Sequence, residues 1–357
     1  MVTTYNTQQM SKIEPADGKL LDILNGFVRS KVLFSAFNLG LFSFIGTDKK
    51  TQQEIQVFLA MPERSARFLV YACQALGVLQ SHSDLYYIAQ DWLPILTSIN
   101  VVDSKMHGLH QYMIGHQYQA LYASMNHLED ILQENEQAKD NRIHWLEYAK
   151  DNPNERDINA YIPFMDSSVA MIAGALLETY SFENKRCVLD LFGSTGVAAN
   201  CFAKRYPNLK TYFMDLPKVV EQSNIADELI GRVRPLGADI YQADFPDDID
   251  VVTIIRSAHD HTTESLLQLF TKAFEKLPKG GNFVIAERMF PEDFTMESED
   301  LYMRAITFLA MSENIDYRKA SQYSALLKKV GFSRTEVHVP EAPYIYYRGM
   351  RVVVATK

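Results

Sequence analysis

The stretch Val188-Leu189-Asp190-Leu191-Phe192-Gly193-Ser194-Thr195-Gly196 decides the fold of this chain. An apolar run ends in an acid, and the chain then turns through a loop of small residues into a predicted helix. About twenty residues further on, a second apolar run ends in Asp215, where an acid can accept both ribose hydroxyls of an adenosine. The pattern therefore predicts a nucleotide-binding edge of a sheet.

The loop differs from the loops that bind nicotinamide dinucleotides. No Gly-x-Gly-x-x-Gly spacing passes through Gly193 and Gly196, and an acid precedes the loop. A loop that holds a pyrophosphate needs successive glycines, because the backbone must approach the phosphates closely. This loop lacks them, so the pattern does not favour a dinucleotide.

The loop and its surroundings resemble those of a known enzyme family. From about Leu20 to the C-terminus, the chain resembles the S-adenosylmethionine-dependent O-methyltransferases of the plant caffeate and bacterial polyketide type, which begin with a winged-helix dimerisation domain. Their loop reads Asp-x-Gly-Gly-Gly-x-Gly and lies under the amino-acid part of the cofactor. Asp190, Gly193 and Gly196 match it, whereas Phe192 and Ser194 replace two glycines. Phenylalanine is strained at positive φ and its ring fills space, so these replacements can reshape the loop.

The remaining cofactor elements follow in the family's order. The segment Met214-Asp215-Leu216-Pro217 resembles the Leu-Asp-Leu-Pro that ends the second strand. Asp239 and Ile240 fall where the family accepts the adenine amino group and packs an apolar side chain on the ring. The resemblance implies S-adenosylmethionine as the cofactor and these ligands: Asp190, Gly193, Gly196, Asp215, Leu216, Asp239, Ile240 and Arg256. The alternative is that Asp215 and Asp239 only cap helices or turns, as acids after strands often do.

The residues expected to carry chemistry follow the apolar run 251–255. His259 and Asp260 match the family's Leu-His-Asp-Trp, whose histidine takes the proton from the substrate hydroxyl. Imidazole titrates near neutral pH and can accept the proton of a phenol, whose pKa is about 10. Glu287 ends the next apolar run, where the family's acid orients the histidine and fixes its tautomer. The resemblance thus implies His259, Asp260 and Glu287 as catalytic residues, although a histidine near a strand end is more often structural.

Two departures from the family affect the expected pocket. His261 replaces a tryptophan, which exchanges an apolar wall for a smaller titratable group and predicts a more polar pocket. Residues 313–318 stand where the family has Gly-x-Glu-Arg-Thr, whose acid is a second partner of the base. Arg318 matches the arginine and Tyr317 falls on the acid, while a one-turn slip would bring Glu313 nearer. Whether Glu313 or Tyr317 assists the base stays open.

The N-terminal third has the pattern of a winged helix. Apolar residues recur at helical spacing from Leu20 to Phe44, and Thr51 with Glu54 has the signature of a capping box. A further helix is expected from Pro62 to Gly77, and two short strands within 78–88. In the resembling family this domain forms an intertwined homodimer, so a second copy of the chain is the expected partner.

A winged helix also suggests DNA binding as an alternative. Its second helix would then need a positive face, but after Arg64 and Arg67 the expected helix continues with mainly apolar residues over 70–73. The formal net charge of -9 and the pI near 5.5 also oppose binding to nucleic acid. We therefore expect no nucleic-acid partner.

The stretch from Val101 to Tyr180 is expected to be helical and to carry part of the substrate pocket. Flexible thioethers and amphipathic rings crowd its first part: Met106, His107, His110, Tyr112, Met113, His116, Tyr118, Tyr122 and Met125. Such side chains suit a cleft for a flat aromatic molecule, although a stripe of this kind is more often core. No metal is expected, because no carboxylate lies at ligand spacing from the histidines. By resemblance, the substrate pocket is lined by Tyr161, Met165, Met303 and Phe308.

Composition and termini are typical of a reduced cytoplasmic enzyme. The 357 residues suit two domains, and Cys73, Cys187 and Cys201 stand in apolar segments as free thiols. Residues 1–10 show neither the basic region nor the apolar core of a signal peptide. Segment 32–45 is too short and too polar to span a bilayer. We expect a soluble protein that stays in the cytoplasm.

The C-terminal half is expected to be a Rossmann-like α/β methyltransferase sheet, mostly parallel, because short apolar strands alternate with helical segments. Its closing segments, Arg334 to Val339 and Tyr344 to Ala355, should form an antiparallel hairpin. The predicted organisation is a winged-helix dimerisation domain over 1–100, a helical substrate-pocket region over 101–180 and an S-adenosylmethionine-binding domain over 181–357.

The expected function is methyl transfer from S-adenosylmethionine to a phenolic hydroxyl of a small natural-product-like molecule, with His259 as the base. A second enzyme hypothesis stays open, because relatives on this scaffold catalyse decarboxylation, hydroxylation or pericyclic reactions. The altered loop and His261 would fit a methyl donor that has become structural or absent. A nitrogen acceptor is a further alternative, since an amine of low pKa needs less help from a base.

Overall fold

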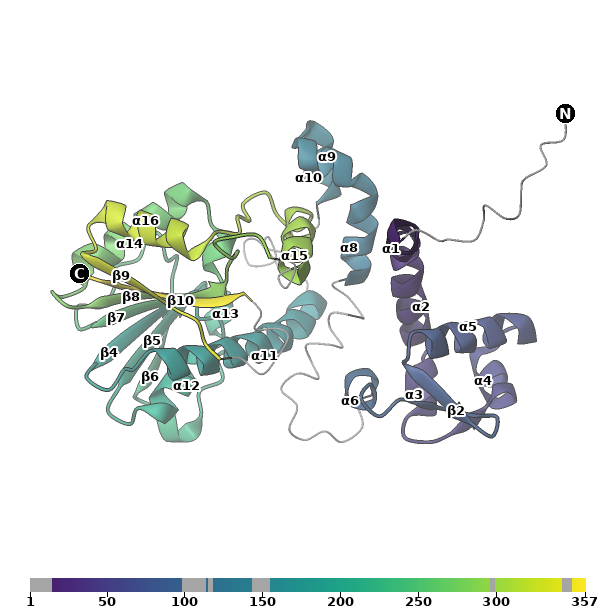
Figure 1. Ribbon diagram of the computed structural model, residues 1–357. Coiled ribbons are helices and arrows are strands. Elements are labelled where there is room, and N and C mark those ends of the chain that lie inside the picture. The colour runs from purple at the N-terminus through teal and green to yellow at the C-terminus, as the bar shows by residue number, and fades with distance from the viewer. Residues whose placement is uncertain (1–14, 98–113, 115–117, 143–154, 296–298, 342–348) are drawn as a thin grey trace, which may run out of the picture. The chain divides into compact units, whose positions relative to one another are not determined.

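The computed structural model describes residues 15–97, 114, 118–142, 155–295, 299–341 and 349–357. The chain divides into two compact units, Met1–Gln119 and Ala120–Lys357. Each unit has its own hydrophobic core, and their elements can be followed along the chain in Figure 1.

The N-terminal unit is mainly helical. Its helices are α1 (Pro15–Leu24), α2 (Gly26–Asn38), α3 (Leu41–Ile45), α4 (Gln52–Leu59), α5 (Glu63–Ala75) and α6 (Leu93–Leu96). Its strands β1 (Lys50–Thr51), β2 (Leu79–His82) and β3 (Leu85–Ile88) form a sheet in the order β1-β3-β2.

Two local predictions for this unit are confirmed. The capping box is present: Thr51 Oγ1 accepts the N–H of Glu54 at 3.2 Å, and a Glu54 carboxylate oxygen accepts the N–H of Thr51 at 2.8 Å. The hairpin of β2 and β3 turns through Ser83 and Asp84. Both have positive φ, which matches the right-handed twist of the strands that they join.

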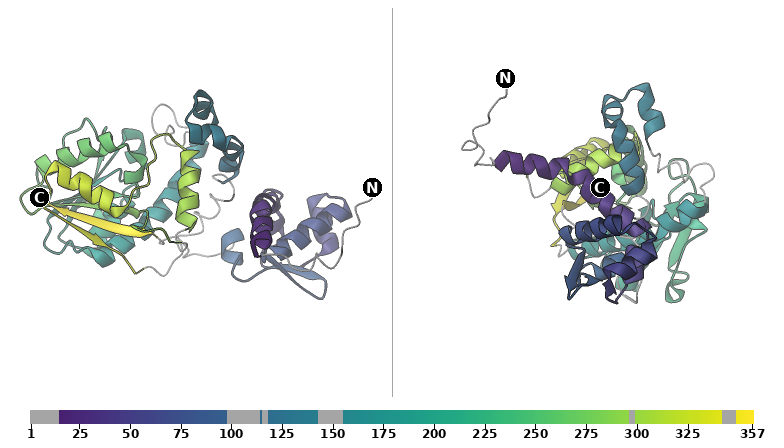
Figure 2. Two further views of the ribbon diagram at one scale, coloured as in Figure 1. Left: turned by 45° about the horizontal axis from the view of Figure 1, so that its top comes forward. Right: turned by 90° about the vertical axis from the view of Figure 1, so that its right-hand side faces the viewer.

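The C-terminal unit is an α/β sheet with helices on both faces (Figure 1, Figure 2). Its strands are β4 (Cys187–Leu191), β5 (Lys210–Asp215), β6 (Val233–Gly237), β7 (Val251–Ile255), β8 (Asn282–Arg288), β9 (Arg334–His338) and β10 (Met350–Thr356). The helices from residue 118 onward are α8 (Tyr118–Ser124), α9 (Leu128–Gln133), α10 (Glu136–Asn141), α11 (Glu155–Thr179), α12 (Val197–Arg205), α13 (Pro217–Val220), α14 (Thr263–Lys276), α15 (Glu299–Leu309) and α16 (Ala320–Val330). Short 3₁₀ helices cover Met125–His127, Asp227–Leu229 and Ala258–Asp260.

The sheet has the strand order β6-β5-β4-β7-β8-β10-β9. Strand β10 runs antiparallel to both β8 and β9, and the other neighbours pair in parallel. This arrangement confirms the predicted methyltransferase sheet with its antiparallel C-terminal hairpin. The order reverses between β4 and β7, and a ligand crevice forms in open α/β sheets at the carboxyl ends of the strands at such a point.

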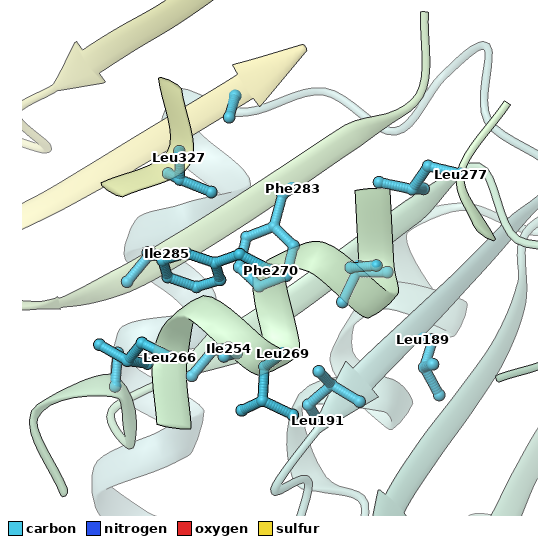
Figure 3. Close-up of a cluster of buried hydrophobic side chains, with 14 of the residues drawn as sticks. Leu189, Leu191, Ile254, Leu266, Leu269, Phe270, Leu277, Phe283, Ile285 and Leu327 are labelled. Atoms are coloured by element: carbon cyan, nitrogen blue, oxygen red, sulfur yellow. The ribbon is translucent and has the colours of Figure 1, made fainter. Parts of the chain in front are cut away.

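Apolar side chains on both faces of the inner strands hold the sheet between its helices. Because successive strand residues point to opposite faces, Leu189 and Ile254 pack with Phe270 of α14 on one face (Figure 3). On the other face Val188 packs with Phe202 of α12 and with residues of α11. With both faces covered, β4 and β7 are buried along their whole length, as parallel strands in such sheets usually are.

Several predicted segments lie partly outside the described residues. Strand β9 ends at His338 and β10 begins at Met350, and residues 342–348 between them lie outside that part. Of the methionine, histidine and tyrosine cluster, these members also lie outside it: Met106, His107, His110, Tyr112, Met113 and His116. Within the described ranges, no helix is both long and apolar enough to cross a membrane.

Candidate functional site

A cavity of about 470 Å³ lies in the C-terminal unit at the carboxyl ends of the parallel strands. Its wall includes residues that follow four different strands. The predicted cofactor ligands in that wall are Asp215, Leu216, Asp239, Ile240 and Arg256. The topology thus brings to one cavity side chains that are far apart in the sequence.

The loop after β4 keeps a left-handed backbone at both positions where a glycine is replaced. Phe192 has a φ of 58° and Ser194 a φ of 50°, and both side chains line the cavity. A residue with a Cβ pays roughly 1–2 kcal/mol in this region. The loop therefore follows a glycine-like path at some cost, with its extra side chains directed toward the cavity.

The two retained glycines serve the packing of the loop on β5. A Cβ at Gly193 would lie 2.6 Å from the Cβ of Phe213, and one at Gly196 would lie 2.7 Å from the Phe213 ring. Gly196 also has a φ of 89°. No side chain fits at either position without a shift of Phe213, which explains why these two glycines are present.

Two carboxyl groups flank the loop. Asp190 is buried at the end of β4 and accepts the hydroxyl of Thr253 at 2.5 Å. Burial raises the pKa of Asp190 to about 7, against the effect of that hydrogen bond. Asp215 accepts the N–H groups of Ser194 and Leu216 at 2.9 and 2.8 Å, and burial raises its pKa although both bonds favour the ionised form.

The segment after β6 places one polar and one apolar group at the cavity. Asp239 is exposed, and its carboxylate accepts the N–H of Tyr241 at 2.9 Å. The neighbouring Ile240 is 4% exposed and belongs to the core beneath the cavity wall. A carboxylate beside an apolar side chain is the combination that the resemblance predicts for an adenine.

The rings of Phe192, Tyr241 and His261 lie against one another in the cavity wall. The His261 ring stacks on Phe192, with centroids 4.3 Å apart, and its Nδ1 lies 2.8 Å from the hydroxyl of Tyr241. Burial and the neighbouring His259 lower the pKa of His261 to about 4. His261 is therefore neutral at physiological pH, so the wall is polar but carries no charge from this ring.

The predicted base and its orienting acid lie together at the ends of β7 and β8. His259 Nδ1 is 3.0 Å from Glu287 Oε2, which also accepts the backbone N–H of His259 at 3.2 Å. A carboxylate only accepts hydrogen bonds, so Nδ1 carries the hydrogen and Nε2 has the free lone pair. His259 Nε2 lies 3.5 Å from Asp260 Oδ1, and Asp260 lines the cavity.

The pKa of the His259 imidazole depends on two opposing effects. Burial alone would lower the pKa of His259, but the carboxylates of Asp260 and Glu287 outweigh it and hold that pKa above its usual value. Burial also raises the pKa of Asp260, which the positive charges of His259 and Arg256 partly oppose. Proton affinity at the base is therefore set by its carboxylate neighbours.

Aromatic rings enclose the imidazole. Tyr317 stacks on His259 with centroids 4.9 Å apart, and Phe308 does so at 5.5 Å with the ring planes only 7° apart. The position that carries an acid in the resembling family thus supplies a ring, whereas Glu313 is exposed. The hydroxyl of Tyr323 donates to Glu287 Oε1 and holds that acid in place.

Of the residues predicted to line the substrate pocket, Met165 is in the cavity wall, and Met303 and Phe308 are not. The sulfur of Met165 contacts an Nη of Arg256 at 2.6 Å. Phe308 stacks on the base, but Met303 on α15 is 57% exposed. The side chain of Tyr161 lies outside the described residues. These assignments remain predictions.

Besides Tyr323, three polar partners of the site residues are not indicated by the sequence. Thr253 binds Asp190, Tyr241 binds His261, and Asp166 on α11 accepts the hydroxyl of Thr195 in the loop at 2.7 Å. Tyr241 directly follows the predicted cofactor ligand Ile240, and this is the one feature of the sequence that could have indicated it. In the part of the chain that the structure describes, no group of three or more histidine, cysteine and acidic residues is placed to hold a metal ion.

Comparisons with known proteins match most of the chain. The sequence model of the O-methyltransferase domain family matches residues 125–333. Demethylspheroidene O-methyltransferase of Cereibacter sphaeroides is 24% identical over 331 residues, covering 92% of this chain and 84% of that protein. The S-adenosyl-L-methionine-dependent methyl transferase PigF of a Serratia species is 21% identical over 322 residues, covering 87% and 89%. The structure of human N-acetylserotonin methyltransferase in complex with S-adenosylmethionine aligns with a TM-score of 0.75 at 18% identity, covering 97% of this chain and 99% of that one.

Proposed function

The chain belongs to the O-methyltransferase domain family and is an S-adenosylmethionine-dependent methyltransferase, and we propose that it methylates a phenolic hydroxyl of a small aromatic molecule. The observation that carries this proposal is the pair of His259 and Glu287, whose imidazole Nε2 lies 3.5 Å from the cavity-lining Asp260 and is left to accept a proton. A phenol with a pKa of about 10 needs such a base at neutral pH.

The residues of the cavity fit the cofactor. Each oxygen of Asp215 accepts one backbone N–H and retains a lone pair for a ribose hydroxyl. The exposed carboxylate of Asp239 can accept an adenine amino group, and the neutral ring of His261 brings no positive charge toward a sulfonium. When bound, S-adenosylmethionine supplies an electrophilic methyl group on a positively charged sulfur.

The residues of the chain then have separate tasks in the reaction. His259 takes the proton of the substrate hydroxyl at Nε2 as the oxygen becomes nucleophilic. Glu287 holds Nδ1–H, which fixes the tautomer and stabilises the imidazolium that forms. Tyr317 and Phe308 hold the plane of the ring by stacking on it. A base positioned in this way typically contributes about 10²- to 10⁴-fold to the rate.

Calorimetric titration with S-adenosylmethionine and with S-adenosylhomocysteine, followed by a panel of phenols with a labelled methyl donor, tests the proposal. We expect both cofactor forms to bind and the label to appear on a phenolic oxygen. Cofactor binding with transfer to an amine instead would show that the acceptor is nitrogen. Binding of neither form would mean that Phe192 and Ser194 close the loop, and would favour the cofactor-free hypothesis.

We also propose that the N-terminal unit forms a homodimer. Helices α1 and α2 expose a run of large apolar side chains, each 44% to 75% exposed: Leu20, Leu21, Ile23, Leu24, Phe27 and Val28. An apolar surface of this kind usually meets a protein partner. Light scattering of the full chain tests this assembly, with replacement of Ile23 and Phe27 by serine expected to shift the mass toward that of a monomer.

A further inference from the structure

Two arginines stand beside the base without a role in the chemistry described above. Arg288 ends β8 directly after Glu287, and Arg304 lies on α15. The guanidinium carbon of Arg304 is 5.9 Å from the ring centroid of Phe308, which itself stacks on His259. Arg288 at the end of β8 and Arg304 on α15 therefore both carry a positive charge near the aromatic wall of the base, which is formed by the Phe308 and Tyr317 rings that stack on His259.

The two guanidinium groups are close enough to affect each other. Burial and the charge of Arg304 lower the pKa of Arg288, although Asp300 opposes this. Burial raises the pKa of Tyr317, with a smaller contribution from Glu287, and the charges of Arg304, Arg288 and Arg256 oppose that rise. Two like charges held near one buried phenol repel each other unless an anion lies between or beside them.

Arg304 lacks the counter-ion that Arg288 has. Arg288 pairs with Asp300. Among the described residues Arg304 forms no ion pair, and its Nε is buried without a hydrogen-bond partner. A buried N–H of a charged group without an acceptor is unfavourable, and the face of Phe308 offsets only part of that. The aromatic wall of the base therefore holds one positive charge and one buried donor without a described acceptor, although neither arginine is among the residues that line the 470 Å³ cavity.

We propose that Arg304, together with Arg288, binds a carboxylate of the acceptor molecule, so that the substrate is a hydroxyaromatic acid. The inference rests on the proposed function, because it takes His259 as the group that meets the acceptor hydroxyl. A guanidinium fork matches a planar carboxylate with two parallel hydrogen bonds. One uncompensated positive charge suits a carboxylate better than a dianionic phosphate. Anchoring the acid orients the ring and leaves its hydroxyl free for the base.

The test compares acids with their neutral esters on the full chain saturated with S-adenosylhomocysteine. The probes are 2-hydroxybenzoate, 3,4-dihydroxybenzoate and 3,4-dihydroxycinnamate, each beside its methyl ester, and their affinities are measured by calorimetry. The variants are Arg304→Gln, Arg304→Lys and, as a matched control for lost charge, the exposed Arg334→Gln. Thermal melting of each variant checks its fold, and methyl transfer to the same probes is measured in parallel.

We expect at least one acid to bind more tightly than its ester, by about 10- to 100-fold, the range for a hydrogen bond to a charged group. Arg304→Gln should remove that preference and leave ester and S-adenosylhomocysteine affinity unchanged, while Arg304→Lys keeps part of it and Arg334→Gln all of it. Equal affinity of acids and esters, failure of all three acids to bind, or a Gln variant that weakens S-adenosylhomocysteine instead, would overturn the proposal.

The same data separate this inference from the proposed function. An acid that binds through Arg304 but receives no methyl group contradicts phenol methylation and supports the anion subsite. A neutral phenol that is methylated while every acid is rejected supports the proposed function and contradicts the subsite.

Discussion

Glu287 accepts two hydrogen bonds from His259 through a single oxygen, one from the ring Nδ1 at 3.0 Å and one from the backbone N–H at 3.2 Å. Its other oxygen accepts the hydroxyl of Tyr323. One buried acid therefore fixes both the backbone and the tautomer of the histidine, so the free lone pair is at Nε2.

Replacement of His259 by alanine should lower the turnover of a methylated phenol by about 10²-fold or more, because the proton acceptor is lost. Cofactor affinity should hardly change, since the His259 side chain contacts Glu287, Phe308 and Tyr317 and is not among the residues that line the cavity. Turnover and calorimetric affinity are measured together, with the exposed His82→Ala as control. Unchanged methyl transfer would remove His259 from the reaction.

The rate should depend on pH through the same histidine. Its pKa lies above the ordinary 6.5 because of Asp260 and Glu287, and only the neutral ring accepts a proton. The value of kcat/KM should therefore rise with pH and level off above the raised pKa. In Asp260→Asn one of the two raising charges is gone, so the pKa falls and the profile should move to lower pH.

The matched control for this pH profile is the exposed Asp244→Asn, which should leave its midpoint in place. A midpoint that stays fixed or rises in Asp260→Asn would mean that another group limits the rate.

Replacement of Asp215 by alanine should weaken the binding of S-adenosylhomocysteine by about 1 to 3 kcal/mol, the cost of a lost hydrogen bond to a charged group. Part of the loss follows from the free Ser194 N–H, which loses its acceptor. Calorimetry measures the change, and the exposed Asp227→Ala serves as control. Equal affinities would mean that Asp215 only holds the loop.

Two substitutions within one loop should differ in their effect on the free energy of unfolding. Gly193→Ala places a methyl group against Phe213 and should reduce the free energy of unfolding by about 1–3 kcal/mol, as overpacking does. Ser194→Gly relieves a left-handed backbone and should change it by no more than about 1 kcal/mol. Urea denaturation measures both; a larger loss for the serine variant would contradict this account of the loop.

Much of the fold and the strand-end residues could be predicted because they depend on local patterns. Apolar runs mark the strands, and the carboxyl ends of parallel strands meet at one edge. Asp215, Asp239 and Arg256 thus fall on one cavity wall whatever the details of their side chains. The capping box at Thr51 is likewise a property of four successive residues.

Contacts between distant segments could not be predicted in this way. Tyr323 meets Glu287 across 36 residues, and Thr253 meets Asp190 across 63. No sequence pattern distinguishes Arg304, and only packing shows that its Nε is buried and its guanidinium lies over Phe308. The left-handed Phe192 was also beyond sequence reasoning, since surrounding structure decides whether such strain is tolerated.

The four positions of the loop at the end of β4 where the family has glycine fall into two pairs, according to where a side chain would lie. Positions 193 and 196 face Phe213 and accept a side chain only if Phe213 shifts, whereas residues 192 and 194 line the cavity and carry side chains. Substitutions at the second pair can therefore change what the cavity accepts, whereas substitutions at the first pair act on folding.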